Sequence, residues 1–165
     1  MAETRNSAQG FAANDRVPPM LELSQINEIL NETPLFAGCA PASLAAIAQA
    51  AKVRDYAKGE VIYNAGDQAL EMYVLILGLV SFKTKSGEGH LHVETLMKRH
   101  MVFGWAALIP EHPRRLGSAT CMDASKVLTI NGDTIMAILA EHPQSGFVVM
   151  KRLCSMIAST FTDKK

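Results

Sequence analysis

The sequence has no excess of either charge and no long apolar run. Sixteen Lys and Arg residues balance sixteen Asp and Glu residues, so the formal net charge is zero. A protein without excess positive charge has no general electrostatic attraction to nucleic acid or to an anionic membrane. No stretch approaches the about 18 consecutive apolar residues of a membrane span, and the N-terminus lacks the apolar segment of a signal peptide. We therefore expect no direct nucleic-acid partner and no membrane partner.

Cysteine is scarce, and the common catalytic motifs are missing. The three cysteines, Cys39, Cys121 and Cys154, are odd in number and widely spaced, which fits neither a disulfide framework nor a C-x-x-C metal site. A reducing cytoplasm is therefore the expected location. Ser118 and Ser125 lie outside any G-x-S-x-G motif and no P-loop occurs. These observations predict a protein that is not an enzyme.

What the sequence does contain is enough apolar residues for one domain. The chain has 165 residues, of which 48% are apolar and 19% charged, as in ordinary globular proteins. Residues 1–19 are rich in Ala, Asn, Ser and Gly and end in Pro18-Pro19, a composition that buries little surface. We predict a disordered N-terminal leader over 1–19 and a single domain over 20–165.

Two short helices are predicted at the start of this domain. In the first, Ile26, Ile29 and Leu30 follow at helical spacing behind Ser24, a candidate N-cap. In the second, an apolar stripe begins just after Pro41, which suits the first turn of a helix; its members are Leu44, Ile47, Ala48 and Ala51.

From Val53 the apolar period changes from helical to strand-like. Short runs such as "EVIYN", "MYVLILG" and "KVLTI" are separated by glycine and Asx turn signals, among them Lys58-Gly59, "NAGD" and "KSGEG". Many short strands with regular turns favour an antiparallel sandwich or roll. We predict a β-roll over about 53–130.

Helical spacing returns after the roll, so we predict C-terminal helices over about 132–161. Asn131 is a candidate cap for the first of them and His142-Pro143 ends it. The last helix, about 145–161, has an apolar stripe that packs either on its own roll or on a second copy of the chain; the stripe comprises Phe147, Met150, Leu153, Cys154, Ile157 and Phe161. A homodimer through this helix is one partner that the pattern allows.

This order of elements resembles the cyclic nucleotide-binding domain family. The segment "PLFAGCAPASLAAIAQAAKVRDYAKGEVIYNAGD" is similar to the family's beginning, "YVLILGLV" to a strand with a mid-strand glycine, and "VFGWAALIPEHPRR" to its phosphate-binding cassette. The similarity covers about residues 29–161. It implies an α+β, mainly β fold: an antiparallel jelly-roll β-roll flanked by N-terminal and C-terminal helices.

The resemblance also implies a ligand site. In the family, a turn leads into a short helix whose backbone N–H groups hold the cyclic phosphate, and an arginine nine or ten positions past the cassette acid pairs with a phosphate oxygen. Gly104 corresponds to the turn glycine, and either Arg114 or Arg115 to the arginine, with Arg114 preferred for its Pro-Arg context. The ligand classes implied are cyclic AMP (cAMP) and cyclic GMP (cGMP), with no metal.

Two positions depart from the family pattern. The family's Phe-Gly-Glu is here Phe103-Gly104-Trp105, so the carboxylate that accepts the ribose 2'-hydroxyl hydrogen bond is missing, a loss of about 1.5–3 kcal/mol. The Trp105 indole either blocks the ribose or offers a stacking surface. His100 stands where the family usually has a glycine in a turn.

Counted back from Gly104, Glu94 and Met97 stand at the positions that usually face the base of a bound nucleotide in this family. Burial of Leu91 and Val93 in the core would instead require the opposite register of this strand. The full predicted ligand set is Glu94, Met97, Phe103, Gly104, Trp105, Ala106, Ala107, Arg114, Arg115 and Ser118.

We therefore predict a cytoplasmic sensor or regulatory module whose C-terminal helices respond to a small anionic ligand and signal to a separate effector protein or a second protomer. A second hypothesis is a degenerate fold that serves only protein contacts, with Trp105 filling the empty pocket. A weaker third hypothesis is a metal-binding cupin-like roll that uses His90, His92 and Glu94.

Overall fold

The computed structural model describes residues 20–84 and 94–162, and side chains as far as Thr160. The predicted leader, the predicted "KSGEG" turn, His90, Leu91, His92 and Val93 lie outside the described residues. No helix in the described part of the chain is long and apolar enough to cross a membrane.

Two helices precede the roll, as the apolar spacing predicts. Helix α1 covers Leu23–Glu32 and helix α2 covers Pro41–Ala50, with Pro41 in its first turn. The prediction of Ser24 as the first N-cap was wrong, because Glu22 caps α1 through a capping box with Gln25. A glutamate replaces the usual Ser or Thr at this cap.

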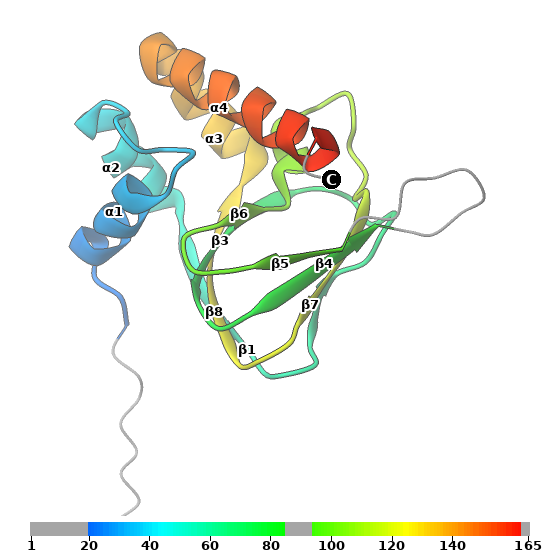
Figure 1. The fold of residues 1–165 in the computed structure, drawn as a ribbon. Helices are drawn as coiled ribbons and strands as arrows, with labels where there is room; N and C mark the ends of the chain where they lie inside the picture. Colours follow the sequence, from blue (N-terminus) through cyan, green and yellow to red (C-terminus); the bar gives the residue numbers. More distant parts are fainter. Residues whose placement is uncertain (1–19, 85–93, 163–165) are drawn as a thin grey trace, which may run out of the picture.

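Eight strands form two four-stranded antiparallel sheets (Figure 1). One sheet has the order β1-β8-β3-β6 and the other β2-β7-β4-β5. Their bounds are β1 Lys52–Tyr56, β2 Val61–Tyr63, β3 Glu71–Leu77, β4 Val80–Thr84, β5 Glu94–Met97, β6 Val102–Phe103, β7 Gly117–Cys121 and β8 Ser125–Asn131. This arrangement confirms the predicted α+β, mainly β roll.

The sequence predicts Gly78 in the middle of a strand, but the structure places it between β3 and β4. It has a φ of +100°, and these two strands belong to different sheets. An added Cβ would lie 2.4 Å from the Ser125 hydroxyl. The glycine is therefore needed where the chain crosses from one sheet to the other.

Two C-terminal helices follow, α3 over Gly132–Glu141 and α4 over Pro143–Thr162. The Asn131 side chain accepts a hydrogen bond from the Thr134 backbone N–H at 3.0 Å, which confirms the predicted cap. Figure 1 shows α4 lying across one end of the roll, beside α3.

Helix α4 is anchored to the N-terminal helices near its start. The Ser145 hydroxyl accepts a hydrogen bond from the Ala40 backbone N–H at 3.0 Å and lies 2.8 Å from the Ser43 hydroxyl. Further along, Arg152 donates to the Ala37 carbonyl. Val149 and Leu153 are buried in the core, whereas Phe147 is 70% exposed. The predicted apolar stripe therefore has one buried side and one exposed side.

The buried residues form two clusters. The larger one packs the four helices against the outside of the β1-β8-β3-β6 sheet, with Leu30, Phe36, Ile47, Ile130 and Ile135 among its members. The smaller one fills the inside of the roll and is rich in aromatic rings; its members include Tyr63, Tyr73, Leu75, Phe103 and Val127. The candidate ligand site lies where the aromatic cluster meets the cassette.

Candidate functional site

The cassette begins with a turn that requires glycine. After β6, Gly104 has a φ of +71° and leads into a short 3-10 helix, η1, over Trp105–Leu108. An added Cβ at Gly104 would lie 2.8 Å from the Tyr73 ring and 2.9 Å from the Arg115 guanidinium. Both the backbone conformation and the close neighbours therefore exclude a larger residue at this position.

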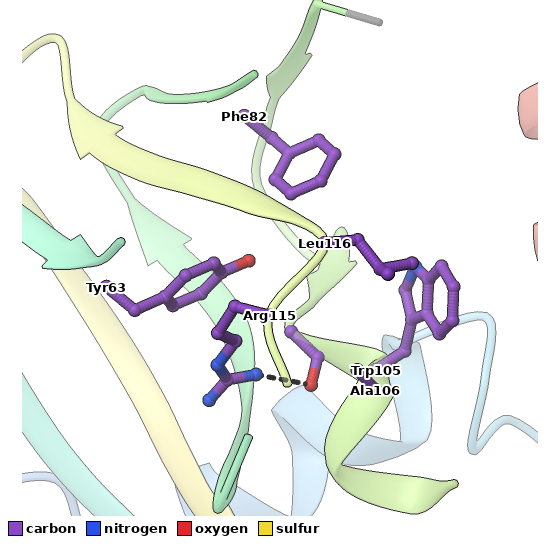
Figure 2. Close-up of a pocket in the computed structure, with 7 residues that line it drawn as sticks. Tyr63, Phe82, Trp105, Ala106, Arg115 and Leu116 are labelled. Atoms are coloured by element: carbon purple, nitrogen blue, oxygen red, sulfur yellow. Dashed lines mark hydrogen bonds between the residues drawn. The ribbon is translucent and has the colours of Figure 1, made fainter. Parts of the chain in front are cut away.

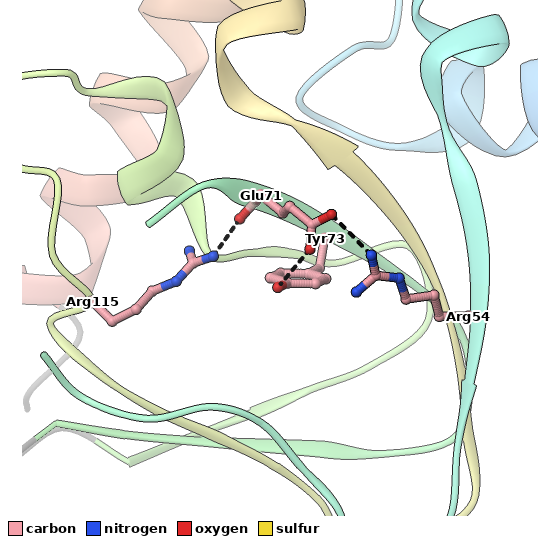
Figure 3. Close-up of polar contacts among 4 residues, drawn as sticks. All are labelled: Arg54, Glu71, Tyr73 and Arg115. Carbon is pink, nitrogen blue, oxygen red and sulfur yellow. Dashed lines mark hydrogen bonds and ion pairs between the residues drawn. The ribbon is translucent and has the colours of Figure 1, made fainter. Parts of the chain in front are cut away.

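Arg115 is the charged residue at the centre of the site. Its side chain is 5% exposed, and its guanidinium donates to the Gly104 carbonyl at 3.0 Å and to the Glu71 carbonyl at 2.7 Å (Figure 2, Figure 3). Arg115 thus links η1 to β3 by two charge-assisted hydrogen bonds.

Aromatic rings complete the surroundings of Arg115. Its guanidinium carbon lies 4.2 Å from the Tyr63 ring centroid and 5.5 Å from that of Tyr73, within the range of cation–π attraction. Its Nε is buried without a hydrogen-bond partner, and no carboxylate lies within ion-pair distance of it, among the residues that the structure describes. The buried charge is therefore balanced by carbonyls and rings rather than by an acid.

Burial raises the pKa of the Tyr63 and Tyr73 hydroxyl groups. It raises the pKa of Tyr73 to about 12, and the nearby Arg115 charge partly opposes this effect. Burial likewise raises the pKa of Tyr63, against the charge of Arg115. The Tyr73 hydroxyl donates to Glu71 at 3.4 Å, and Glu71 also pairs with Arg54 at 3.1 Å (Figure 3). Both phenols are therefore neutral at physiological pH.

Arg115 borders two cavities, and the one on the cassette side is small. A cavity of about 20 Å³ is lined by Tyr63, Phe82, Gly104, Trp105, Ala106, Arg115 and Leu116 (Figure 2). A cavity needs about 10–15 Å³ to hold one water, whereas pockets for drug-sized ligands are about 300–1,000 Å³. On the cassette side the space is therefore too small for a phosphate, whereas on its other side Arg115 lines a cavity of about 280 Å³ together with Tyr63, Glu71 and Tyr73.

The other predicted cassette residues lie at different distances from this cavity. Arg114 is exposed, and its guanidinium donates to the Gly66 carbonyl at 3.2 Å. The Ser118 hydroxyl lies outside the cavity and accepts a hydrogen bond from the Ala65 N–H at 2.9 Å. Phe103 is buried against Tyr73, and Ala107 is buried against Gly132. The structure thus brings Arg115, rather than the preferred Arg114, into the cassette.

A larger cavity, which Arg115 does not line, lies between the roll and α4. It measures about 450 Å³ and is lined by Phe82, Glu94, Thr95, Met97, Met101, Val102, Trp105, Met156, Ser159 and Thr160. Glu94 and Met97, the two residues predicted to face a base, both line it. Trp105 lines both cavities, and its ring points away from the Arg115 guanidinium in Figure 2.

His100 adopts the backbone conformation that glycine usually provides. Its φ is +63°, the one positive φ of a non-glycine residue in the described chain. Its Nδ1 lies 3.5 Å from a Glu32 carboxylate oxygen. Histidine tolerates this region better than most residues, so the turn before β6 keeps its shape without the glycine.

Metal ligands do not gather in the described residues: no group of three or more His, Cys, Asp or Glu side chains there is placed to hold an ion. His90 and His92, which the metal hypothesis requires, are outside them.

Comparison with known proteins now identifies the family. Residues 53–142, more than half of the chain, match the family model described as "Cyclic nucleotide-binding domain". The chain belongs to the cyclic nucleotide-binding domain family. All of α3 and the whole β-roll except Lys52 fall within the matched segment.

Three similar proteins have names that describe regulators or parts of regulators. The chain is 22% identical, over 135 residues, to a CRP-like cAMP-activated global transcriptional regulator of Mycobacterium tuberculosis, covering 82% of this chain and 60% of the relative. It thus spans about 60% of the length of that curated relative.

Among solved structures, it is similar to the sensor domain of the transcriptional regulator DNR from Pseudomonas aeruginosa, with a TM-score of 0.71, 16% identity, and coverage of 87% of this chain and 95% of that one. It is also similar to the regulatory subunit of a cAMP-independent protein kinase A from Trypanosoma cruzi bound to guanosine, with a TM-score of 0.68, 16% identity, and coverage of 81% and 46%.

Several residues of the site were not predicted from the sequence. Tyr63, Tyr73 and Glu71 surround Arg115, and Met101, Met156 and Thr160 line the larger cavity. The inward direction of Tyr63 and Tyr73 follows from strand alternation and was available as a signal. The contribution of α4 was not, because nothing in the sequence places the end of that helix opposite the cassette.

Proposed function

We propose that this chain is a regulatory sensor module: a small-molecule ligand bound between the roll and α4 sets the position of α4, which carries the signal to a partner. The observation that carries the proposal is the cavity of about 450 Å³, which has the cassette residue Trp105 on one wall and Met156, Ser159 and Thr160 of α4 on another. A ligand there contacts both the cassette and the helix, so it shifts α4 by its differential affinity for two helix positions.

Cyclic nucleotides, cAMP or cGMP, are the first ligands to test, because the family is the cyclic nucleotide-binding domain and the curated relative is cAMP-activated. In this proposal Arg115 receives the phosphate, with Arg114 as the alternative, and Gly104, Trp105, Ala106 and Ala107 form the cassette around it. Phe103 and Ser118 support the cassette, and Glu94 and Met97 face the base. A phosphate needs the small cavity to open by movement of Arg115 or Trp105.

The partner is a separate effector protein or a second copy of this chain. Along α4, Phe147 and Cys154 are exposed, and Met150 and Ile157 are half-buried at the edge of the core; the four residues are spaced by three, four and three. We call these four residues the outer seam. Such spacing suits the pairing of two helices. The proposal places the protein in the cytoplasm and includes no catalytic step, no metal and no direct contact with nucleic acid or membrane.

A thermal-shift titration with cAMP, cGMP, cyclic dinucleotides and guanosine tests the proposal. A ligand that binds only the folded state stabilises it by about 2.7 kcal/mol at one hundred times its dissociation constant. For a cyclic nucleotide we expect a rise in the melting temperature that is lost in Arg115→Ala and kept in Arg114→Ala, whereas guanosine has no phosphate for either arginine to bind. The opposite pattern would assign the phosphate to Arg114.

A nucleotide-independent interaction module is the second candidate. It is favoured by the small cassette cavity, in which Arg115 already bonds to both Gly104 and Glu71. Absence of any shift at millimolar ligand, in a protein that still melts cooperatively, would support this candidate over the nucleotide sensor.

A further inference from the structure

We propose that the cavity between the roll and α4, here called the α4 cavity, binds a flat aromatic ring system that is neutral or cationic and carries no phosphate. This inference rests on the proposed sensor function, because it names the class of ligand that the sensor detects. It is argued from the size of the cavity, the chemistry of its walls and the position of Arg115 outside it.

The α4 cavity has the size and apolar surface for a ring system. Its volume of about 450 Å³ lies within the roughly 300–1,000 Å³ of small-molecule sites. The apolar wall consists of Phe82, Met97, Met101, Val102, Trp105 and Met156. Aromatic rings stack on one another, and thioethers both contact ring edges favourably and adapt to irregular shapes. These walls therefore favour a planar apolar ligand.

The charges around the α4 cavity disfavour an anion. Among the described residues that line it, Glu94 is the one ionisable side chain, and its carboxylate pairs with Lys83 at 3.2 Å. Neither Arg114 nor Arg115 lines this cavity. A phosphate placed here would lose its hydration shell without a cationic partner, which costs several kcal/mol. A ligand without negative charge avoids this cost.

Arg115 does not turn toward the α4 cavity to supply the missing cation. Its guanidinium is committed to the carbonyls of Gly104 and Glu71 and to the faces of two tyrosine rings. Moving it would remove a charged donor from both carbonyls, although the Gly104 carbonyl would keep its hydrogen bond from the Ala107 N–H at 3.2 Å; a hydrogen bond to a charged group contributes about 1.5–3 kcal/mol. The cassette cation and the α4 cavity are therefore separate sites, and a ligand of the α4 cavity does not depend on Arg115.

A matched pair of dyes tests the size and charge of the ligand on the full chain. N-phenyl-1-naphthylamine is a neutral ring system, and 8-anilinonaphthalene-1-sulfonate is the same ring system with an added sulfonate. Trp105 is the only tryptophan and lines the cavity, so quenching of its emission reports binding at this place. We expect the neutral dye to quench Trp105 emission and the anionic dye to bind at least about tenfold more weakly.

Variants on α4 localise the site. Ser159→Phe places a ring in the α4 cavity, and we expect it to weaken binding of the neutral dye at least about tenfold. Ser155→Phe makes the same change one turn earlier at an exposed position that does not line the cavity, and we expect it to leave binding within about twofold. Thr95→Phe fills the same cavity from β5 and is the second blocking variant if Ser159→Phe does not fold.

Each outcome decides the proposal. Binding of the neutral dye that is lost in Ser159→Phe or Thr95→Phe, and kept in Ser155→Phe, supports it, whether or not a nucleotide shifts the melting temperature. Unquenched Trp105, equal binding to the blocking variants, or tighter binding of the sulfonated dye overturns it. If a cyclic nucleotide nevertheless raises the melting temperature in an Arg115-dependent way, the proposed function stands and only this ligand class is wrong.

Discussion

Arg115 is the residue on which the cassette most depends. It donates to carbonyls on both η1 and β3, whereas Arg114 makes one exposed hydrogen bond. We expect Arg115→Met to lower the free energy of unfolding by about 2 kcal/mol, because two buried carbonyls lose a charged donor. Arg114→Met changes one exposed contact, so we expect less than about 0.5 kcal/mol. Urea unfolding of both variants measures the difference, and equal effects would show that the two buried hydrogen bonds contribute no net stability.

Tyr63 and Tyr73 make the stability of the roll sensitive to high pH. Burial raises the pKa of Tyr73 to about 12 and raises that of Tyr63 as well, compared with about 10 in an unfolded chain. The unfolded state therefore loses these protons first, and their stabilising contribution is complete below about pH 10 and falls as the pH rises toward 12. We expect phenolate absorbance of these residues to appear together with unfolding. Tyr73→Phe, the control, should make the loss of stability with pH less steep.

His100 offers a direct measure of backbone strain. Both His100→Gly and His100→Ala remove the contact of the imidazole with Glu32, and they differ only in the Cβ at a φ of +63°. We expect the glycine variant to be more stable than the alanine variant by about 1 kcal/mol. Thermal melting of the two variants side by side measures this difference, and identical melting temperatures would show that the turn relaxes without cost.

At the scale of elements, the first residue of α3 fits tightly against η1. A Cβ at Gly132 would lie 2.1 Å from the Ala107 carbonyl oxygen, whereas one at Gly146 in α4 would lie 3.0 Å from the Leu139 carbonyl oxygen. We expect Gly132→Ala to push the cassette away from α3 and to destabilise the protein by about 1–3 kcal/mol.

Gly146→Ala is the matched control for Gly132→Ala. The gain in helix propensity, about 1 kcal/mol, offsets its milder crowding, so we expect a smaller effect in chemical denaturation. A Gly132→Ala protein as stable as the wild type would mean that α3 and η1 move apart freely.

Helices and caps could be predicted where a local sequence pattern determines them. Elements whose position depends on tertiary contacts were harder to predict. Apolar spacing placed α1 and α2, and Asn131 was recognised as a cap because its amide bonds within its own turn. The cap of α1 was missed because a capping box that starts from glutamate is unusual. The two-residue strand β6 was missed because so short a segment has no alternation, and its pairing with β3 is set by the fold.

At the scale of the whole molecule, the outer seam predicts a parallel homodimer through α4. Such pairing places Cys154 of one copy near Cys154 of the other. Cys154 is exposed, whereas burial raises the pKa of the Cys39 and Cys121 thiols and makes them less reactive. We expect diamide to take two electrons from a pair of Cys154 thiols and to give a disulfide-linked dimer, which is visible on a non-reducing gel and absent in Cys154→Ser.

A charge in the outer seam provides the second test of this dimer. Phe147→Glu places a carboxylate on the exposed side of α4 and should give a monomer by light scattering without loss of the fold. A wild-type protein that is monomeric at high concentration would contradict pairing through this seam and leave a separate effector as the partner.

The fold of the molecule was predictable from its sequence to a greater extent than its site. The turn glycines and the order of elements indicated the roll, because each signal acts within a few residues. The choice between Arg114 and Arg115 was not decidable from spacing, since they lie nine and ten positions past Trp105, which stands at the cassette-acid position. Burial among Tyr63, Tyr73 and two carbonyls distinguishes them, and those partners come from strands far apart in the sequence.

The anchoring of α4 gives it the mechanics of a rod clamped at one end. Ser145 holds its first half to the start of α2, Arg152 holds it to the loop between α1 and α2, and the α4 cavity lies under its last turns. Beyond Arg152 the axis extends about 12 Å to Thr160 at about 1.5 Å per residue, so a tilt of about 10° displaces that end by about 2 Å. The displacement of α4 is thus greatest at the end that lines the α4 cavity and least near Ser145. If a ligand moves α4 as proposed, stronger contacts at Ser145 and Arg152 would reduce the tilt of the helix, and weaker contacts would let it move without a fixed direction.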